Sequence, residues 1–556
     1  MKKQSFLAGA IVLTISGIVC KILGALYKIP LTNILGSQGM GIYYIIFPVY
    51  AFMLTFVSSC FTISISKAVS AAVAKDDFSA AHKYFKASLL LLFLIGGGLC
   101  LVMFLLAKII SNLQGLSNIY ICYFIIAPSI IAVAVQSGFK GFFQGLQNMT
   151  PSAISQILEQ IVKLTVGFSL ASLLVGRGVL WGACGALVGI LISEVSTCAY
   201  FAVSYFAFKI KNKNLYASGH TQQTKTLKTA GGAESGKYKC ENLTSERGKR
   251  TSQKECMKEV FLNAVPFMLS SLIIPLSLMV DSFLIVNILK SMGFDKFFAT
   301  ALLGLNSGVV STLVSLPATV SSSLCTTIVP YITFSIASGN NAAVSQKIGL
   351  AMKLTFIISL PCFFVFVFFS PNIIKILYSF ESIYEHNLAS SLLMISSVNV
   401  LYLAVLQLTI AILQAFGKSY IPVVNLTIGL VFKVVFECVL IYIPSLNISG
   451  AIVSNIVCYL VPCLLNSIQI KKYAELRLNL WQTFAAPTIS SAVMIATIFM
   501  SIQLFSRLFS FRLGSLFAFL AGAIIYFACI LLFKTFSKEE KQSFLLFKAK
   551  KKAHTA

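Results

Sequence analysis

Long uninterrupted apolar segments constrain this chain more than any other feature of its sequence. Residues 87–107, ASLLLLFLIGGGLCLVMFLLA, contain no charged side chain. A helix of about 20 such residues crosses a bilayer core, and backbone exposed to lipid must satisfy its own hydrogen bonds. Similar segments recur between short polar stretches, so we expect an all-α, polytopic membrane protein with about 14 transmembrane helices. A β-barrel is excluded because its strands would alternate polar and apolar residues.

The distribution of charge predicts the topology. The 556 residues include 43 Lys and Arg against 17 Asp and Glu. With a cytoplasmic N-terminus and an even number of helices, most basic residues fall in cytoplasmic loops and in the two termini. The outer loops keep only Lys108, Arg177, Lys290, Lys296, Lys375, Arg507 and Arg512. This asymmetry follows the positive-inside rule and favours two cytoplasmic termini. The basic stretches lack interleaved aromatics and a folded context, so we expect no nucleic-acid partner.

A polar segment near the middle divides the chain. Residues 209–258 are rich in Lys, Arg, Ser and Thr, which predicts a basic cytoplasmic linker. We expect an N-lobe of helices 1–6 before it (1–208) and a C-lobe of helices 7–12 after it (259–470). Helices 13 and 14 (471–535) and a basic cytoplasmic tail (536–556) would follow. The apolar start continues to Pro30 without a clean cleavage site, which favours an uncleaved first helix over a signal peptide.

The two halves show a weak internal repeat. Asn-Ile-Leu at 33–35 recurs at 287–289, in each case after the first helix of a half. Segments 144–163 and 414–433 both run from Gln to Lys, with a Pro opening the helix that carries the Lys. Six helices per half would relate the copies by an axis along the membrane normal, as in transporters whose lobes rock around a shared cavity.

Ionisable residues at membrane depth are the candidates for function, because each is costly unless it faces a cavity or a partner. Lys21 and Lys28 are seven residues apart and share a face of the first helix. At 1.5 Å per residue, Lys21 would lie beyond the bilayer midpoint and Lys28 near the outer surface. Lys28 could therefore be an interfacial anchor that snorkels, whereas Lys21 is the stronger candidate for a cavity.

Six further ionisable residues are expected inside helices. Two opposite-charge pairs, four residues apart, could neutralise each other on one helix face, either as structural ion pairs or as functional groups. These are Glu159 with Lys163 and Lys433 with Glu437. Asp281 and Glu194 have no partner within helical reach. Each is either a cavity-facing acid for a cation or proton, or the partner of a lysine from another helix.

The sequence carries no recognisable catalytic site. Its four histidines are far apart and lie outside the predicted helix cores, and no phosphate-binding GxxxxGK[ST] loop is present. The 14 cysteines form no paired metal-ligand spacing and are interpreted as packing residues. We therefore expect no enzyme activity, no cofactor and no metal. Transport would be driven by an ion gradient (Na⁺ or H⁺), the membrane potential or substrate supply.

Three segments resemble a known family. CKILGALYKIPLTNILGSQGMGIYYIIFPVY (20–50) followed by ISISKAVS (63–70), FKGFFQGLQNMTPSAISQILEQIVK (139–163) and LQLTIAILQAFGKSYIPVVNLTIGLVFK (406–433) are similar to the stage V sporulation protein B group. That group belongs to the multidrug/oligosaccharidyl-lipid/polysaccharide exporter superfamily and is related to murein-precursor flippases. The resemblance covers nearly the whole chain, and GFFQGLQNMTP is its most specific part.

The resemblance implies a bacterial inner-membrane protein that moves a polyprenyl-pyrophosphate-linked saccharide to the outer leaflet. It places Lys21 and Lys28 where the group usually has basic residues, and Lys67 at the lysine that closes ISISK. The chain lacks the helix-2 arginine of the murein-precursor flippases, since residues 51–59 are uncharged. The resemblance also implies that helices 13 and 14 form a groove for the polyprenyl tail.

Three function classes follow from these observations. The first is a lipid-linked saccharide flippase that serves peptidoglycan or spore-cortex synthesis, with lysine as a mobile point charge for the pyrophosphate. The second is a cation-coupled, MATE-like antiporter of small organic molecules that uses Asp281 or Glu194 as its coupling acid. The third, a membrane enzyme such as a glycan polymerase, is disfavoured because the longest outer loop, near 371–387, offers few acids or histidines.

Overall fold

The structure is a computed structural model that describes residues 6–74, 77–211, 253–337, 340–380, 382–474, 479–505, 507–533 and 535. These ranges contain helices and turns but no strand. The first half comprises α1 (Phe6–Thr55), α2 (Ser59–Ala74), α3 (Phe78–Leu113), η1 (Ser117–Ile119), α4 (Tyr120–Gly145), α5 (Thr150–Val162), η2 (Lys163–Gly167), α6 (Phe168–Val175) and α7 (Val179–Lys211). The predicted all-α polytopic class is therefore confirmed.

The second half is built in the same way. It comprises α9 (Gln253–Ser271), α10 (Ile273–Ser291), α11 (Lys296–Leu303), η5 (Gly304–Val310), α12 (Ser311–Ala337), α13 (Asn341–Leu377), α14 (Ile383–Ala415), α15 (Tyr420–Leu440) and α16 (Ile448–Tyr473), followed by η6 (Trp481–Ala485), α17 (Ala486–Phe505) and α18 (Phe511–Leu532). The segments η2, η5 and η6 are π-helical. Helix α7 reaches Lys211 and α9 begins at Gln253, so both helices extend into the predicted linker, and residues 212–252 lie outside the described ranges.

Helix α1 changes direction at Gly36. This residue has φ 66° and ψ −177° inside an otherwise helical segment, a backbone geometry that glycine adopts without strain from a side chain. The apolar span that includes it, Ile22–Ala74, has 53 residues. At 1.5 Å per residue it would measure about 80 Å if straight, far more than one bilayer crossing requires. The kink therefore divides this long span, and the described residues contain 13 candidate spans in all.

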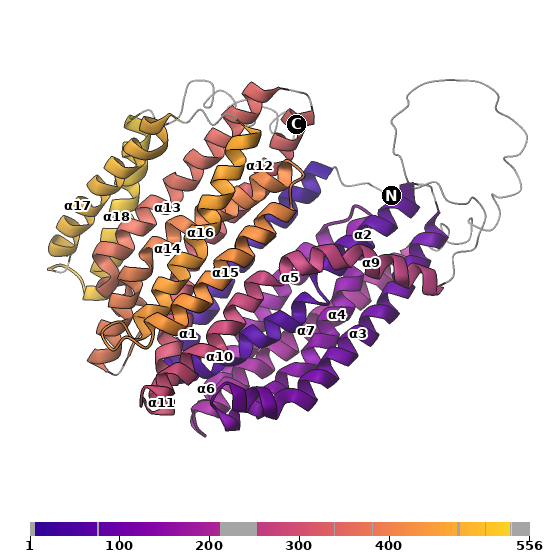
Figure 1. Ribbon diagram of the computed structural model, residues 1–556, viewed down its shortest axis with the longest axis horizontal. Coiled ribbons are helices and arrows are strands. Elements are labelled where there is room, and N and C mark those ends of the chain that lie inside the picture. The colour runs from indigo at the N-terminus through magenta and orange to yellow at the C-terminus, as the bar shows by residue number, and fades with distance from the viewer. Residues whose placement is uncertain are drawn as a thin grey trace, which may run out of the picture.

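The helices form two groups and a flanking pair (Figure 1). Helices α3 to α7 pack on one another in one group, and α12 to α16 pack on one another in the other. Helix α1 contacts both groups, since it packs on α5, α6 and α7 and also on α10, α11 and α12. The long kinked helix is thus a central element shared by the two lobes.

Helix α9 departs from the predicted division of the chain. Although it begins the second half, it packs on α2 and α3, beside the first lobe (Figure 1). Ser64 Oγ donates to the carbonyl of Val260 at 2.7 Å, and Tyr84 Oη donates to Glu259 Oε2 at 2.7 Å. The second half of the chain therefore begins with a helix that docks on the first half.

Helices α17 and α18 pack beside α13, at the edge of the bundle (Figure 1). Tyr526 Oη donates to the carbonyl of Ile357 at 2.7 Å. The buried Lys353 Nζ donates to Gln482 Oε1 at 2.8 Å and to the carbonyl of Thr535 at 3.1 Å. Polar contacts thus join α13 to α18, to η6 at the start of α17, and to Thr535 after α18.

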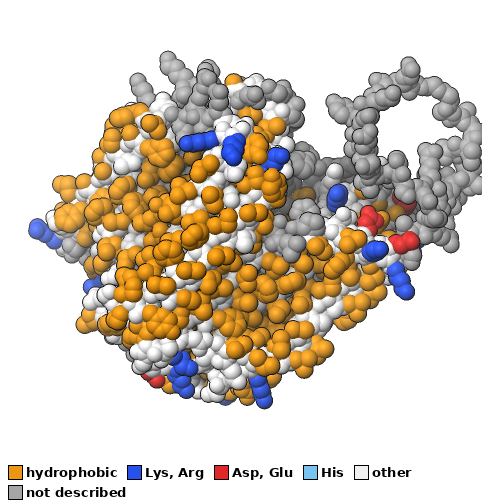
Figure 2. Space-filling view, viewed as in Figure 1, with side chains coloured by type: hydrophobic (Ala, Val, Ile, Leu, Met, Phe, Trp, Pro, Cys, Tyr) orange, Lys and Arg blue, Asp and Glu red, His pale blue; other side chains and the backbone are white. Residues whose placement is uncertain are grey.

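The surface agrees with a membrane setting. In Figure 2, hydrophobic side chains cover the flanks of the visible face, and the Lys and Arg side chains gather toward its two ends. Exposed large apolar residues are numerous on α3, α15 and α18, including Leu105, Val431 and Leu532. Such a surface is compatible with hydrocarbon and would be a liability in water. The chain is a multi-pass membrane protein.

Candidate functional site

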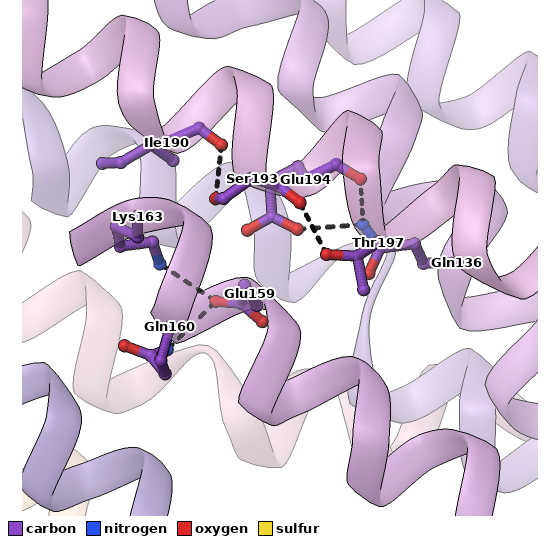
Figure 3. Close-up of polar contacts among 8 residues, drawn as sticks. All are labelled: Gln136, Glu159, Gln160, Lys163, Ile190, Ser193, Glu194 and Thr197. Atoms are coloured by element: carbon purple, nitrogen blue, oxygen red, sulfur yellow. Dashed lines mark hydrogen bonds and ion pairs between the residues drawn. The ribbon is translucent and has the colours of Figure 1, made fainter. Parts of the chain in front are cut away.

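Each lobe contains a group of charged side chains near the middle of its helices. The group in the first lobe, here called the N-cluster, comprises Glu159, Lys163 and Glu194 (Figure 3). Lys163 Nζ lies 2.9 Å from Glu159 Oε1, which is the same-helix ion pair that the spacing predicts. Glu194 on α7 is 6% exposed and points toward this pair. Lys163 neutralises Glu159, so Glu194 leaves these three side chains with one uncompensated carboxylate.

Neighbouring polar groups hold Glu194 in place. Gln136 Nε2 on α4 donates to Glu194 Oε2 at 2.9 Å and to the Glu194 carbonyl at 2.7 Å. Glu194 also interacts electrostatically with Glu159, Lys163 and Lys140. Lys140, which sequence reasoning did not single out, therefore supplies the second positive charge near the N-cluster. The sequence does contain a sign of its importance, since Lys140 is a charged residue within an apolar helix, directly before GFFQG (141–145).

The backbone around the N-cluster is unusual. The π-helical segment η2 begins at Lys163, directly after the ion-paired turn. Gly189 of α7 approaches this segment so closely that a Cβ there would overlap the Cα of Gly167. The absence of a side chain at Gly189 therefore allows α7 and η2 to touch. π-helical turns occur frequently at functional sites because they rotate side chains out of the regular helical register.

The first helix borders the N-cluster. Ser16 Oγ donates to Gln156 Oε1 at 3.4 Å, and Cys20 interacts electrostatically with Glu159 and Lys163. The residue after Cys20 is Lys21, whose side chain lies outside what the structure describes. The α1 turn that carries Lys21 is thus at the level of the N-cluster.

The second lobe contains the C-cluster, which comprises Asp281, Lys433 and Glu437. Lys433 Nζ on α15 lies 2.6 Å from Asp281 Oδ1 on α10 and donates to Ser277 Oγ at 2.9 Å. The nearest acid to Lys433 is therefore Asp281, and the predicted Lys433–Glu437 pair on one helix is not the ion pair that forms. Of the two alternatives for Asp281, the structure shows the one with a lysine from another helix.

Glu437 adds a second carboxyl to the C-cluster. Its side chain is 0% exposed, and neither of its oxygens accepts a hydrogen bond from the described residues. It interacts with both Asp281 and Lys433. Two carboxyl groups can hydrogen-bond to each other only when one of them carries a proton. The C-cluster therefore has one net negative charge when both acids are ionised, and none when they share a proton.

The two clusters occupy matching places in the repeat. Helix α5 begins at Thr150 and α15 at Tyr420, thirteen residues before Lys163 and Lys433 respectively. Each cluster combines this lysine with two acids. The partner differs: Lys163 pairs along its own helix, whereas Lys433 pairs across to α10. The repeat predicted from sequence therefore places a lysine at the same position in both lobes, whereas the acids around it come from different positions.

The structure does not bring the other predicted basic residues together. Lys28 Nζ lies over the ring of Tyr44, 5.3 Å from its centroid. Lys67 is exposed on α2. Lys28 is eight residues before the kink at Gly36 and Lys67 is thirty-one residues after it. At 1.5 Å per residue they lie near opposite ends of the bundle, so the described side chains form no compact cationic site.

Metal binding finds no support among the side chains that the structure describes. Within the described ranges, no group of three or more His, Cys, Asp or Glu residues is arranged to hold a metal ion. The candidate site is therefore a pair of charge clusters, one in each lobe. Such an arrangement can bind or release a cation or a proton.

Comparisons with known proteins agree with this architecture. Residues 6–336 match the family described as polysaccharide biosynthesis protein. The chain is 27% identical over 487 residues to the lipid II flippase MurJ of Bacillus subtilis (strain 168), covering 85% of this chain and 83% of the relative. It is 26% identical to stage V sporulation protein B of the same organism over 553 residues, covering 97% and 98%.

A solved structure shows the same fold. A lipid II flippase MurJ in an inward closed conformation superimposes with a TM-score of 0.65 at 15% sequence identity, covering 94% of this chain and 99% of that one. At this identity the likeness concerns the fold. It extends over both lobes and the C-terminal pair, so the whole architecture is shared.

Proposed function

The chain belongs to the polysaccharide biosynthesis protein family, and from this premise we propose that it is a flippase for a polyprenyl-pyrophosphate-linked saccharide. The cargo is a lipid II-like peptidoglycan precursor or a related polysaccharide unit, used in cell-wall or spore-cortex synthesis. The protein lies in the bacterial cytoplasmic membrane with both termini inside. It works by alternating access, in which the two lobes rock around a shared cavity.

The observation that carries this proposal is similarity along nearly the whole chain. Stage V sporulation protein B and this chain match over 97% of this chain, which includes both lobes and the C-terminal pair. The match to the lipid II flippase covers 85% of the chain. Relatives that share every element, rather than one motif, support a common transport cycle for this chain. The distribution of Lys and Arg supports the proposed orientation.

The cationic residues are assigned to the anionic head group. We place Lys67 near the cytoplasmic entrance, Lys21 at the level of the N-cluster and Lys28 near the outer exit, so that the pyrophosphate meets them in turn. A lysine ammonium holds phosphate as a point charge and releases it more readily than a bidentate arginine. The separation of Lys28 and Lys67 along the bundle suits successive contacts better than one tight site.

The charge clusters are assigned to coupling. The C-cluster contains one more acid than its lysine balances, and its net charge changes when one of its two carboxyls takes up a proton. A bound Na⁺ or H⁺ would neutralise that excess and alter the contact between α10 and α15. The lipid-linked saccharide, membrane lipids and a coupling ion are thus the expected partners, and no nucleic acid is expected.

The excess of buried carboxyl groups favours a second candidate function. A cation-coupled antiporter of small organic molecules, similar to MATE proteins, would use Glu194 or Asp281 as its coupling acid. Such a protein needs acids in its cavity and has no need of Lys21. The two functions therefore differ in their dependence on the first-helix lysine, which the following experiment measures.

The test uses cells depleted of their own lipid II flippase. Expression of this chain is expected to restore survival and the arrival of lipid II at the outer leaflet. The variant Lys21→Ala is expected to abolish rescue at an unchanged protein level, because the head group loses its midpoint cation. Lys296→Ala is the matched control, because Lys296 is exposed and its Nζ lies over the adjacent Phe297 ring at 4.9 Å.

Two outcomes would count against the proposal. If the wild-type chain inserts correctly but does not rescue, the cargo is another saccharide or the function is antiport. Resistance to cationic dyes under an ion gradient would then identify the antiporter. If Lys21→Ala rescues as well as Lys296→Ala, the assignment of Lys21 is wrong even where the flippase function holds.

A further inference from the structure

The repeated Asn-Ile-Leu motif has a structural counterpart that the charge clusters do not explain. Asn33 lies three residues before the kink at Gly36, and Asn287 lies near the end of α10. The two asparagines are at equivalent places in the two halves. Each makes side-chain hydrogen bonds to a segment of the other half of the chain.

Asn33 caps the end of α13. Its Nδ2 donates to the carbonyl of Leu377 at 3.0 Å, and its Oδ1 accepts from the backbone N–H of Ser379 at 3.0 Å. Leu377 is the last residue of α13. The final carbonyls of a helix have no partner within the helix, so a side-chain donor at this point satisfies one of them.

Asn287 caps the end of α3 in the same way. Its Nδ2 donates to the carbonyl of Leu113 at 2.6 Å, and Leu113 is the last residue of α3. Lys290 Nζ, one turn further on, donates to the carbonyl of Gly115 at 3.0 Å. Gly115 has φ +81°, and a Cβ there would lie 2.8 Å from Asn287 Oδ1, so glycine makes room for this contact.

The two caps are reciprocal. Helices α3 and α13 both follow the second crossing of their halves, so they are equivalent in the repeat. An asparagine of the first half therefore caps a helix of the second, and its equivalent in the second half caps the matching helix of the first. This end of the bundle, where α1 kinks, is here called the kink end.

Other contacts at the kink end also join the two halves. Ser37 Oγ donates to Glu385 Oε1 at 2.5 Å, and Gln114 Nε2 donates to Ser282 Oγ at 3.2 Å. The backbones cross closely as well, because a Cβ at Gly304 would overlap the carbonyl oxygen of Ser37. The kink end is therefore closed by polar groups and by direct backbone contact.

We propose that Asn33 and Asn287 form a symmetric latch that keeps the kink end closed and opens once in every transport cycle. This inference rests on the proposed alternating-access function, in which the kink end faces outward. The bonds suit a latch, because hydrogen bonds near water are weak enough to break and re-form. Two matched bonds, one from each half of the chain, would hold both lobes.

The test measures access of water to the closed interface. Met40 is 0% exposed and packs against Gly308 across the two halves, so a Met40→Cys reporter is shielded while the kink end is closed. Labelling by a membrane-impermeant thiol reagent in intact cells is compared with the same chain lacking the reporter, which gives the signal from natural cysteines. Asn33→Ala and Asn287→Ala are each expected to raise reporter labelling about 2- to 10-fold, and the double variant more than either.

Asn387→Ala is the matched control. Asn387 is an exposed asparagine in the first turns of α14, at the kink end, and its variant is expected to leave labelling unchanged. Unchanged labelling in the Asn33→Ala, Asn287→Ala double variant would overturn the latch. The labelling measurement does not depend on the cargo. If the asparagine variants raise labelling but the wild-type chain does not rescue flippase-depleted cells, the result supports the latch and contradicts the proposed cargo.

A locked variant provides a second, independent readout. The variants Asn33→Cys and Ser379→Cys are combined in one chain and joined with a short bismaleimide. A protease site inserted between residues 212 and 252 reports the crosslink, because joined halves stay together on a denaturing gel. Crosslinked protein is expected to lose rescue in proportion to the joined fraction. Full rescue by fully crosslinked protein would show that these two segments do not need to part.

Discussion

The buried ammonium group of Lys433 shows how the cost of desolvation is balanced by ion pairing in this protein. Lys433 is 1% exposed and lies within 2.6 Å of Asp281 Oδ1, with Glu437 beside them. Removing a lysine from water costs several kcal/mol, which the carboxylate and the Ser277 hydroxyl offset. Removing the charge of one of these side chains should therefore destabilise the protein more than removing both charges of the Lys433–Asp281 ion pair.

We expect Lys433→Met to destabilise the protein by about 3–5 kcal/mol, because it leaves two acids buried without a cation. The measurement is thermal unfolding of the purified protein in detergent, followed by the loss of monodisperse material. Adding Asp281→Asn to Lys433→Met should restore part of this stability, since a neutral amide replaces one uncompensated charge. A double variant less stable than Lys433→Met would contradict the assignment of Asp281 as the partner of Lys433.

Helices cross at the kink end without room for side chains. Gly41 of α1 faces Thr300 of α11, and a Cβ at Gly41 would overlap the Thr300 carbonyl oxygen. Both residues lie in regular helix, so the glycine serves close approach rather than a special backbone angle. Close crossings of this kind at small residues are a common way for membrane helices to pack.

Gly41→Ala should therefore destabilise the protein by about 1–3 kcal/mol through overpacking. Gly97→Ala is the matched control, because a Cβ added at Gly97 of α3 would meet no atom within 4 Å, and alanine there should be neutral or slightly stabilising. Both variants are compared by thermal unfolding. Equal melting temperatures for the two variants would show that the α1–α11 crossing can relax around a methyl group.

The apolar runs were sufficient to predict these elements, but not all their partners. Runs such as 87–107 predict helices because membrane backbone has few other solutions. The Glu159–Lys163 pair was predictable because both residues share one helix face. The Lys433–Asp281 pair was not, since it depends on which faces of α10 and α15 meet. The docking of α9 on α2 and α3 was not predictable either, because it too depends on which helix faces meet.

The whole molecule is interlocked rather than divided between its halves. Helix α9 belongs to the second half of the chain and packs on the first, and α1 belongs to the first half and contacts α10, α11 and α12. Each half therefore buries a helix surface in the other. We infer that the covalent connection between residues 211 and 253 is not what holds the lobes together.

This predicts that the chain can be cut. Co-expressed fragments 1–230 and 231–556 should both enter the membrane, and most of the second should co-purify with a tag on the first. A second fragment that starts at residue 273 lacks α9, and with it the Ser64–Val260 and Tyr84–Glu259 contacts, so its recovery should fall several-fold. Membrane-fraction levels of both second fragments serve as the insertion control. Equal recovery of the two would show that α1 and the contacts at the kink end join the halves without a contribution from α9.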